Sequence, residues 1–153
     1  MYEKSFPNKR FKLTIEFLKK YVTKNDTILD LGVSNPLTKI IIDSGLNVTN
    51  TQGEDLDLDQ SALKKSNATV VTAFEIFEHL LSPFEVLKNI QSDKLVASVP
   101  LKLWFASAYR SSTDDWDRHY HEFEDWQFNW LLEKTGWKII DSQKWTNPIN
   151  KIG

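Results

Sequence analysis

The chain has 153 residues, of which 41% are hydrophobic and 26% charged, which is typical of one folded domain with a single core and argues against disorder. The net charge of -2 argues against a broad nucleic-acid surface, because binding phosphates needs clustered Lys and Arg. The absence of cysteine excludes disulfides, thiolate metal sites and thiol nucleophiles, and without a membrane-spanning run or secretory signal we expect a cytoplasmic protein with no integral membrane segment.

The first predicted element is an amphipathic helix over residues 11–22, where apolar side chains recur at helical spacing. The elements that follow alternate in type. In chain order they are a buried strand at 27–33, a helix from Pro36 to Gly45, a strand at 46–51, an acidic loop at 54–59, a buried strand at 68–74, a helix from 83 to about 90, a strand at 94–99, a helix at 125–135 and a final strand at 137–145.

Local signals refine two of these helices. In the helix that Pro36 opens, Leu37, Ile40 and Ile41 are expected to face the core. At residues 82–85 the sequence Ser-Pro-Phe-Glu predicts a capping box, in which the Ser82 and Glu85 side chains bind each other's backbone N–H groups.

The alternation of strands and helices predicts an α/β domain with a mainly parallel sheet and helices on both faces. Ligands of such sheets bind beyond the carboxyl ends of the strands, where the strand order reverses. Gly32 follows a strand and precedes a helix, so a ligand can approach its backbone closely. The turns after the strands that end near Leu31, Thr51 and Phe74 are expected to line one crevice.

Several segments resemble class I S-adenosylmethionine-dependent methyltransferases of the small-molecule type. The similarity covers roughly residues 11–145, and the motifs that carry it are Ile28–Gly32, Phe74–Leu80 with Ser82-Pro83, Val96–Pro100, His119–Phe123 and Leu131–Trp137. The sequence departs from the family pattern in its glycine turn, which carries only Gly32, and in its second strand, which ends Thr-Asn-Thr instead of in the acid that binds the ribose.

The resemblance implies a three-layer Rossmann-like methyltransferase fold that lacks the seventh strand, with the third strand also hard to place. Residues 1–153 would form a single domain with its core at 11–145, and the chain would be either truncated at its C-terminus or a reduced version of the fold. The implied activity is methyl transfer from S-adenosylmethionine to a small molecule or a carrier-linked metabolite.

The cofactor-binding residues that we expect are Asp30, Gly32, Ser34, Asn50, Thr51, Asp55, Leu56, Phe74 and Glu75. By resemblance, Asp30 and Gly32 would contact the methionine part and Asn50 or Thr51 the ribose, while Asp55 and Leu56 would border the adenine. The alternative for Asp30 is a cap on the following turn. Glu75 and Glu78 have the alternative of solvated surface acids.

The catalytic candidates are His79 and His121, and the substrate-binding candidates are Trp104, Tyr109, Arg110, His119 and Tyr120. His79 is either a base or a packing histidine that donates to a backbone carbonyl. His119 and His121, with Glu122, also fit a metal site, but no third ligand stands at a telling spacing and we predict no metal. Arg110 and Arg118 either bind an anionic substrate group or pair with nearby aspartates.

All six tryptophans lie between residues 104 and 145, and the long connection before residue 120 has no core periodicity. The aromatic 104–130 region is either a lid over a substrate or a surface that is buried by the missing C-terminal strand, a homodimer or other partner, or a membrane interface. Trp130, Trp137 and Phe128 are expected in the core. The second hypothesis for the chain as a whole is a non-catalytic methyltransferase-like binding or assembly module, and a nicotinamide enzyme is a distant third because G-x-G-x-x-G is absent.

Overall fold

A computed structural model of the chain describes residues 2–102 and 113–145. Its centre is a sheet of four parallel strands in the order β2-β1-β3-β4. The strands are β1 (Thr27–Asp30), β2 (Asn47–Asn50), β3 (Val70–Phe74) and β4 (Lys94–Ser98). The helices are α1 (Tyr2–Lys19), α2 (Pro36–Asp43), α3 (Ser61–Lys65), α4 (Pro83–Asn89) and α5 (Asp125–Lys134), with the short 3-10 helices η1 (Phe77–His79) and η2 (Asp115–Asp117).

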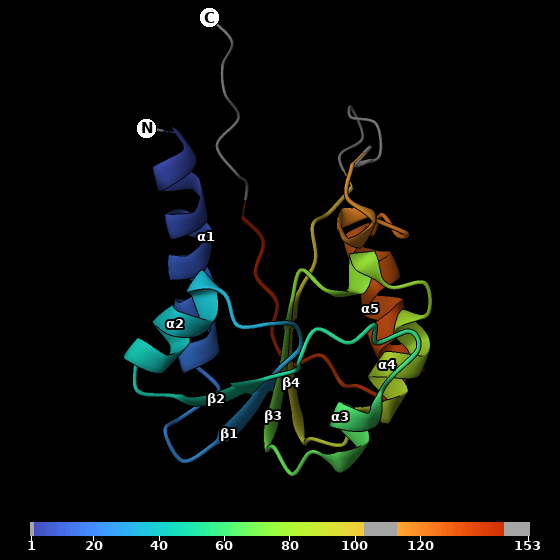
Figure 1. Cartoon of the computed structure of the whole chain (residues 1–153), viewed down its shortest axis with the longest axis horizontal. Coiled ribbons are helices and arrows are strands. Elements are labelled where there is room, and N and C mark those ends of the chain that lie inside the picture. The colour runs from blue at the N-terminus through green and yellow to red at the C-terminus, as the bar shows by residue number, and fades with distance from the viewer. Residues whose placement is uncertain (1, 103–112, 146–153) are drawn as a thin grey trace, which may run out of the picture.

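The helices cover the sheet in two groups (Figure 1). Helices α1 and α2 lie against one face, and α3, α4 and α5 lie on the other side. Adjacent strand residues supply the two cores, because side chains alternate between the faces of a sheet. Ile28 and Val70 pack with α1 and α2, whereas their neighbours Leu29 and Val71 pack on the opposite face. The fold is therefore α/β with helices on both faces of a parallel sheet, an arrangement compatible with a Rossmann-like fold.

The strand order places a topological switch between β1 and β3. From β1 the chain passes through α2 to β2 at the edge of the sheet, and then returns through α3 to β3 on the other side of β1. The register pairs Asp30 with Thr72, so the carboxyl ends of β1 and β3 lie side by side. This is the position at which open α/β sheets form ligand crevices.

The structure confirms most of the predicted elements between residues 27 and 135 and corrects several details. Helix α1 begins well before residue 11, at Tyr2, and α3 occupies part of the region in which a third strand was sought. Ile40 is 37% exposed instead of facing the core, and the buried polar residue Thr38 lies on the inner face of α2. No described helix is long and apolar enough to cross a membrane.

The capping box predicted at Ser82 is wrong. Ser82 does precede α4, but its side chain makes no capping hydrogen bond. The carboxylate of Asp57 accepts from the backbone N–H groups of Leu81 and Ser82 instead, each at 2.8 Å. Asp57, a residue distant in the sequence, has thus taken the role predicted for Glu85 as the acceptor for the Ser82 N–H.

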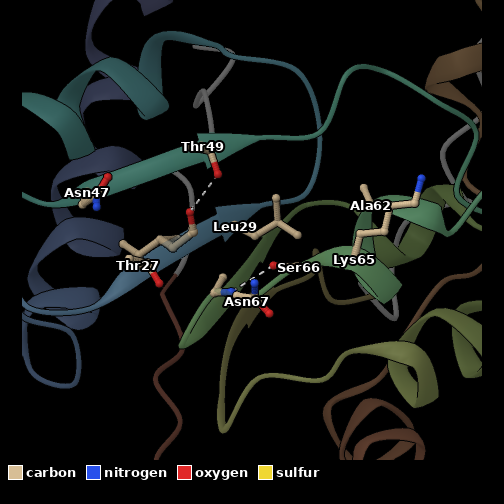
Figure 2. A pocket seen from close by; sticks show the side chains of 10 residues that line it. Thr27, Leu29, Asn47, Thr49, Ala62, Lys65, Ser66 and Asn67 are labelled. Carbon is tan, nitrogen blue, oxygen red and sulfur yellow. Dashed lines mark hydrogen bonds between the residues drawn. The ribbon is translucent and has the colours of Figure 1, made fainter.

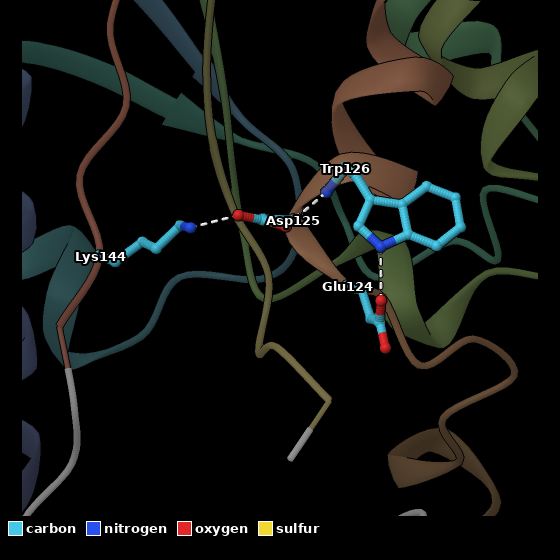
Figure 3. Close-up of polar contacts among 4 residues, drawn as sticks. All are labelled: Glu124, Asp125, Trp126 and Lys144. Carbon is cyan, nitrogen blue, oxygen red and sulfur yellow. Dashed lines mark hydrogen bonds and ion pairs between the residues drawn. The ribbon is translucent and has the colours of Figure 1, made fainter. Parts of the chain in front are cut away.

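The strand predicted at 137–145 is also wrong, since this described segment has no secondary structure. Its backbone forms no strand pairing with the sheet, and side-chain contacts connect it to the rest of the fold. The Trp137 indole donates to the Leu87 carbonyl at 3.3 Å, and Lys144 pairs with Asp125 at the start of α5 (Figure 3). Trp130 was expected in the core but is 64% exposed, whereas Phe128 and Trp137 pack against the core as predicted.

Candidate functional site

Two hollows lie away from the carboxyl ends of β1 and β3. One of about 450 Å³ lies over the first residues of β1 and β2 and beside α3, where Thr27, Asn47 and Lys65 line it (Figure 2). The other is an open surface recess beside Trp130 on α5. Neither hollow has the position that the topology favours for a ligand.

Asp30 is the centre of a polar network at the end of β1. Its carboxylate is 4% exposed and accepts from the Thr72 hydroxyl at 2.6 Å and from the Asn50 amide at 2.9 Å. Burial raises the pKa of Asp30, and hydrogen bonds from Thr72, Asn50 and Thr38 oppose that change. Asp30 therefore does not cap the following turn with its side chain. Its contacts tie β1 to the strands on both sides.

Gly32 has the conformation expected of a turn that brings backbone to a ligand, with a φ of +112°. Its N–H donates to the Thr51 hydroxyl at 2.7 Å and its carbonyl accepts from the Asn50 amide at 3.0 Å. A Cβ at this position would lie 3.4 Å from the Ile76 side chain. Asp30, Gly32, Asn50 and Thr51, all predicted from sequence to contact a cofactor, are thus brought together at one point.

The other predicted cofactor residues lie outside the turn, and two of them pack in the core. Ser34 is exposed beyond the turn, and Glu75 follows the last residue of β3. Leu56 is 6% exposed and belongs to the core, while the Asp55 carboxylate accepts from the Asp57 N–H at 3.0 Å. Phe74 packs against the core on the α1 side. For a cofactor contact, Leu56 and Phe74 could offer only the edges of side chains that the core already holds.

Two acids follow β3, of which Glu75 is partly buried and Glu78 is buried. Glu75 has a φ of +56°, which is costly for a residue with a side chain and is frequent at functional sites. Glu78 is only 1% exposed, and one carboxylate oxygen of each acid is buried with no hydrogen-bond partner among the described residues. Burial raises the pKa of Glu75, and burial together with the neighbouring Glu75 raises that of Glu78 to about 8. For Glu78, the alternative of a solvated surface acid is wrong.

Two histidines stand beside Glu78. The Nδ1 atom of His79 lies 2.9 Å from the Arg118 carbonyl, and its Nε2 lies 3.5 Å from Glu78 Oε1. The rings of His79 and His119 are in edge-to-face contact with centroids 4.7 Å apart. Burial lowers the pKa of His119 and His79 adds to this effect, while Glu122 and Asp117 oppose it. His79 thus has the backbone carbonyl contact that was predicted for a packing histidine. It also contacts the side chains of Glu78 and His119.

The remaining predicted site residues lie around or beyond this cluster. His121 is turned away, with Nε2 3.2 Å from the Leu81 carbonyl and its ring stacked on Phe123. Tyr120 is 43% exposed and donates its backbone N–H to the Glu78 carbonyl. Trp104, Tyr109 and Arg110 lie outside the described residues.

The structure assembles a different set of possible metal ligands from the one weighed in the sequence. His119 and His121 do not share a site, whereas Glu78, His79 and His119 place ligand atoms within 4.8 Å of one another. The adjacent pair Glu78-His79 was a signal in the sequence. The third residue, His119, lies 40 positions after His79, and only the folded chain shows that it joins this pair.

Comparisons with the models of known protein families, with curated proteins and with solved structures find no match for this chain.

Proposed function

We propose that this chain is an S-adenosylmethionine-dependent methyltransferase that acts on a small molecule or a carrier-linked metabolite. The observation that carries the proposal is the position of the Asp30–Gly32 turn at the switch point between β1 and β3. A buried acid and a glycine at positive φ, at the place where a parallel sheet opens, are what the sequence motifs of the methyltransferase family predict. The proposed fold is correspondingly a reduced methyltransferase fold.

The residues at the turn suit the polar end of such a cofactor. Each carboxylate oxygen has two acceptor sites. Asp30 therefore keeps acceptor capacity for an ammonium group, directly or through water, beyond its bonds to Thr72 and Asn50. Asn50 directs its amide N–H groups inward, so its carbonyl oxygen would accept from a ribose hydroxyl. A neutral acceptor binds a hydroxyl less strongly than a carboxylate does, and we expect loose cofactor binding.

In methyl transfer from a sulfonium, the main task of the protein is to position the cofactor and the substrate. The sulfonium supplies an activated methyl group, and the protein holds the two reactants in line. A base is needed only when the attacking atom must lose a proton. A carbonyl contacts one ring nitrogen of each of the two predicted catalytic histidines, but only His79 lies close after β3, in η1, beside the strand that carries the turn. His79 is therefore the better of the two predicted catalytic histidines.

Thermal unfolding with S-adenosylmethionine and S-adenosylhomocysteine tests the proposal. A ligand at 100 times its Kd stabilises the folded state by about 2.7 kcal/mol, which raises the Tm of a domain of this size by roughly 5–10 °C. Gly32→Val should abolish the shift. Gly45→Val is the matched control, because Gly45 also has a positive φ (+90°) but lies at the end of α2 with open space around it. No shift in the unmodified chain at millimolar ligand would reject the proposal.

A second function, a non-catalytic binding or assembly module, is favoured by one observation. Asp30, Asn50 and Thr51 direct polar atoms toward one another and toward Gly32, and these contacts form a closed network without any ligand. The exposed pair Trp126 and Trp130, in edge-to-face contact at 4.9 Å, would then be a candidate contact for a homodimer or another partner. The same thermal unfolding measurements separate the two functions, since a module of this kind binds neither ligand.

A further inference from the structure

Three side chains from two distant segments converge beside the carboxyl end of β3. Glu78 and His79 lie in η1, and His119 follows η2. Two backbone hydrogen bonds hold the segments together, from the N–H groups of Tyr120 and His121 to the Glu78 carbonyl at 2.8 and 3.2 Å. The ligand atoms of the three side chains all lie within 4.8 Å of one another.

The contact between His79 and Glu78 requires a proton or a cation between the two side chains. A carbonyl oxygen can only accept, so His79 must carry a proton on Nδ1, which lies 2.9 Å from the Arg118 carbonyl. In a neutral imidazole the Nε2 atom then presents a lone pair, and it faces Glu78 Oε1 at 3.5 Å. Two acceptors that face each other repel unless a proton or a cation lies between them.

The burial of Glu78 makes this requirement stronger. Its side chain is 1% exposed, its Oε2 has no hydrogen-bond partner among the described residues, and the same is true of Oε2 of nearby Glu75. Buried carboxylates are normally paired, hydrogen-bonded or bound to a metal. A proton shared by Glu78 Oε1 and His79 would satisfy that one contact. It would leave Glu78 Oε2 without a partner, whereas a metal ion can be bound by both oxygens of one carboxylate.

We propose that Glu78, His79 and His119 bind a divalent transition-metal ion, of the class represented by zinc and cobalt(II). Two imidazoles and a carboxylate form one of the common protein donor sets for zinc. With bonds of about 2.1 Å, two donors on a tetrahedral ion are about 3.4 Å apart. Glu78 Oε1 and His79 Nε2 already stand at 3.5 Å, and small side-chain rotations bring His119 within reach.

The surroundings resemble the outer shell of a metal site. Histidine ligands usually donate their second N–H to a carbonyl or carboxylate, which fixes the ring. The Arg118 carbonyl does this for His79, and the Glu122 carboxylate lies 3.7 Å from His119 Nδ1. Three protein donors leave at least one position on the ion for water or a substrate oxygen. Calcium, which takes six to eight oxygen ligands, does not suit the set.

The test uses the full chain purified without a polyhistidine tag and stripped with a chelator. Cobalt(II) is titrated while the visible spectrum is recorded, and zinc and calcium are titrated by calorimetry. We expect one zinc or cobalt per chain, absorption bands typical of nitrogen and oxygen ligands, and no binding of calcium. No cofactor is added, so the result does not depend on the proposed methyl transfer.

Variants locate the ion. Glu78→Gln and His119→Gln should each weaken zinc binding by at least about 10-fold, which is the lower limit for losing even an outer-shell partner. His121→Gln is the matched control, because His121 lies in the same segment but outside the cluster, and its affinity should stay unchanged. His119→Gln keeps the test valid if Glu78→Gln does not fold, since His119 lies outside both cores. The proposal fails if zinc binds no more tightly than millimolar, or if His121→Gln loses as much affinity as His119→Gln.

Discussion

Replacing Glu78 with glutamine should change how the stability of the protein depends on pH. The folded chain holds the Glu78 proton more tightly than the unfolded chain, because burial and Glu75 raise its pKa from 4.5 to about 8. Arg10 opposes this shift and Glu122 adds a little to it. Glutamine has nearly the same shape and cannot ionise, so it removes this titration from both states.

The sign and size follow from proton linkage. Below pH 4.5 both states carry the proton, and the carboxyl has no pH-dependent effect. Between pH 4.5 and 8 the unfolded chain ionises while the folded chain does not, so the free energy of unfolding falls by about 1.4 kcal/mol per pH unit. The full loss is at most about 5 kcal/mol and is complete above pH 8. Relative to Glu78→Gln, the wild type should lose about 3 kcal/mol between pH 5.5 and 7.5.

Urea unfolding followed by tryptophan fluorescence measures this difference, in the presence of a chelator so that metal binding does not contribute. Glu85→Gln is the control, because Glu85 is an exposed acid at the start of α4 and its variant should follow the wild-type curve. If the curves of wild type and Glu78→Gln run parallel from pH 5.5 to 7.5, Glu78 is not a buried acid with a raised pKa, and the reasoning is refuted.

Three further predictions concern the network and the turns. Thr72→Val keeps the shape of a buried side chain but removes the hydroxyl that donates to Asp30. The free energy of unfolding, measured with urea, should fall by about 1–3 kcal/mol. A loss below roughly 0.5 kcal/mol would mean that this hydrogen bond contributes little to stability. Asp57→Ala removes the acceptor for two backbone N–H groups before α4, and hydrogen exchange at Leu81 and Ser82 should accelerate while exchange in β1 stays unchanged. Gly32→Ala forces a side chain into a φ of +112°, and urea unfolding should show a loss of about 1–2 kcal/mol, whereas an unchanged stability would show that the turn relaxes.

The fold class could be predicted from the sequence because the signals for individual strands and helices are local. Hydrophobic runs such as 68–74 and stop signals such as Gly45 and Gly136 depend on neighbours a few residues away, and the structure confirms the elements that they mark. The strand at 137–145 was wrong for the opposite reason. Its residues favour an extended backbone, but a strand must also pair with the edge of a sheet, and local sequence does not show whether the segment lies along one.

The same distinction holds for the candidate site. The motif around Asp30 and Gly32 was visible because a strand, a glycine and a helix follow one another directly, whereas the metal cluster joins residues 78, 79 and 119. Sequence spacing pointed to His119 with His121, which tertiary contacts separate. The fold class could be predicted from local patterns of hydrophobic and turn-forming residues. The ligand set was decided by which distant segments pack together, because a binding site depends on distances in space and not on positions along the chain.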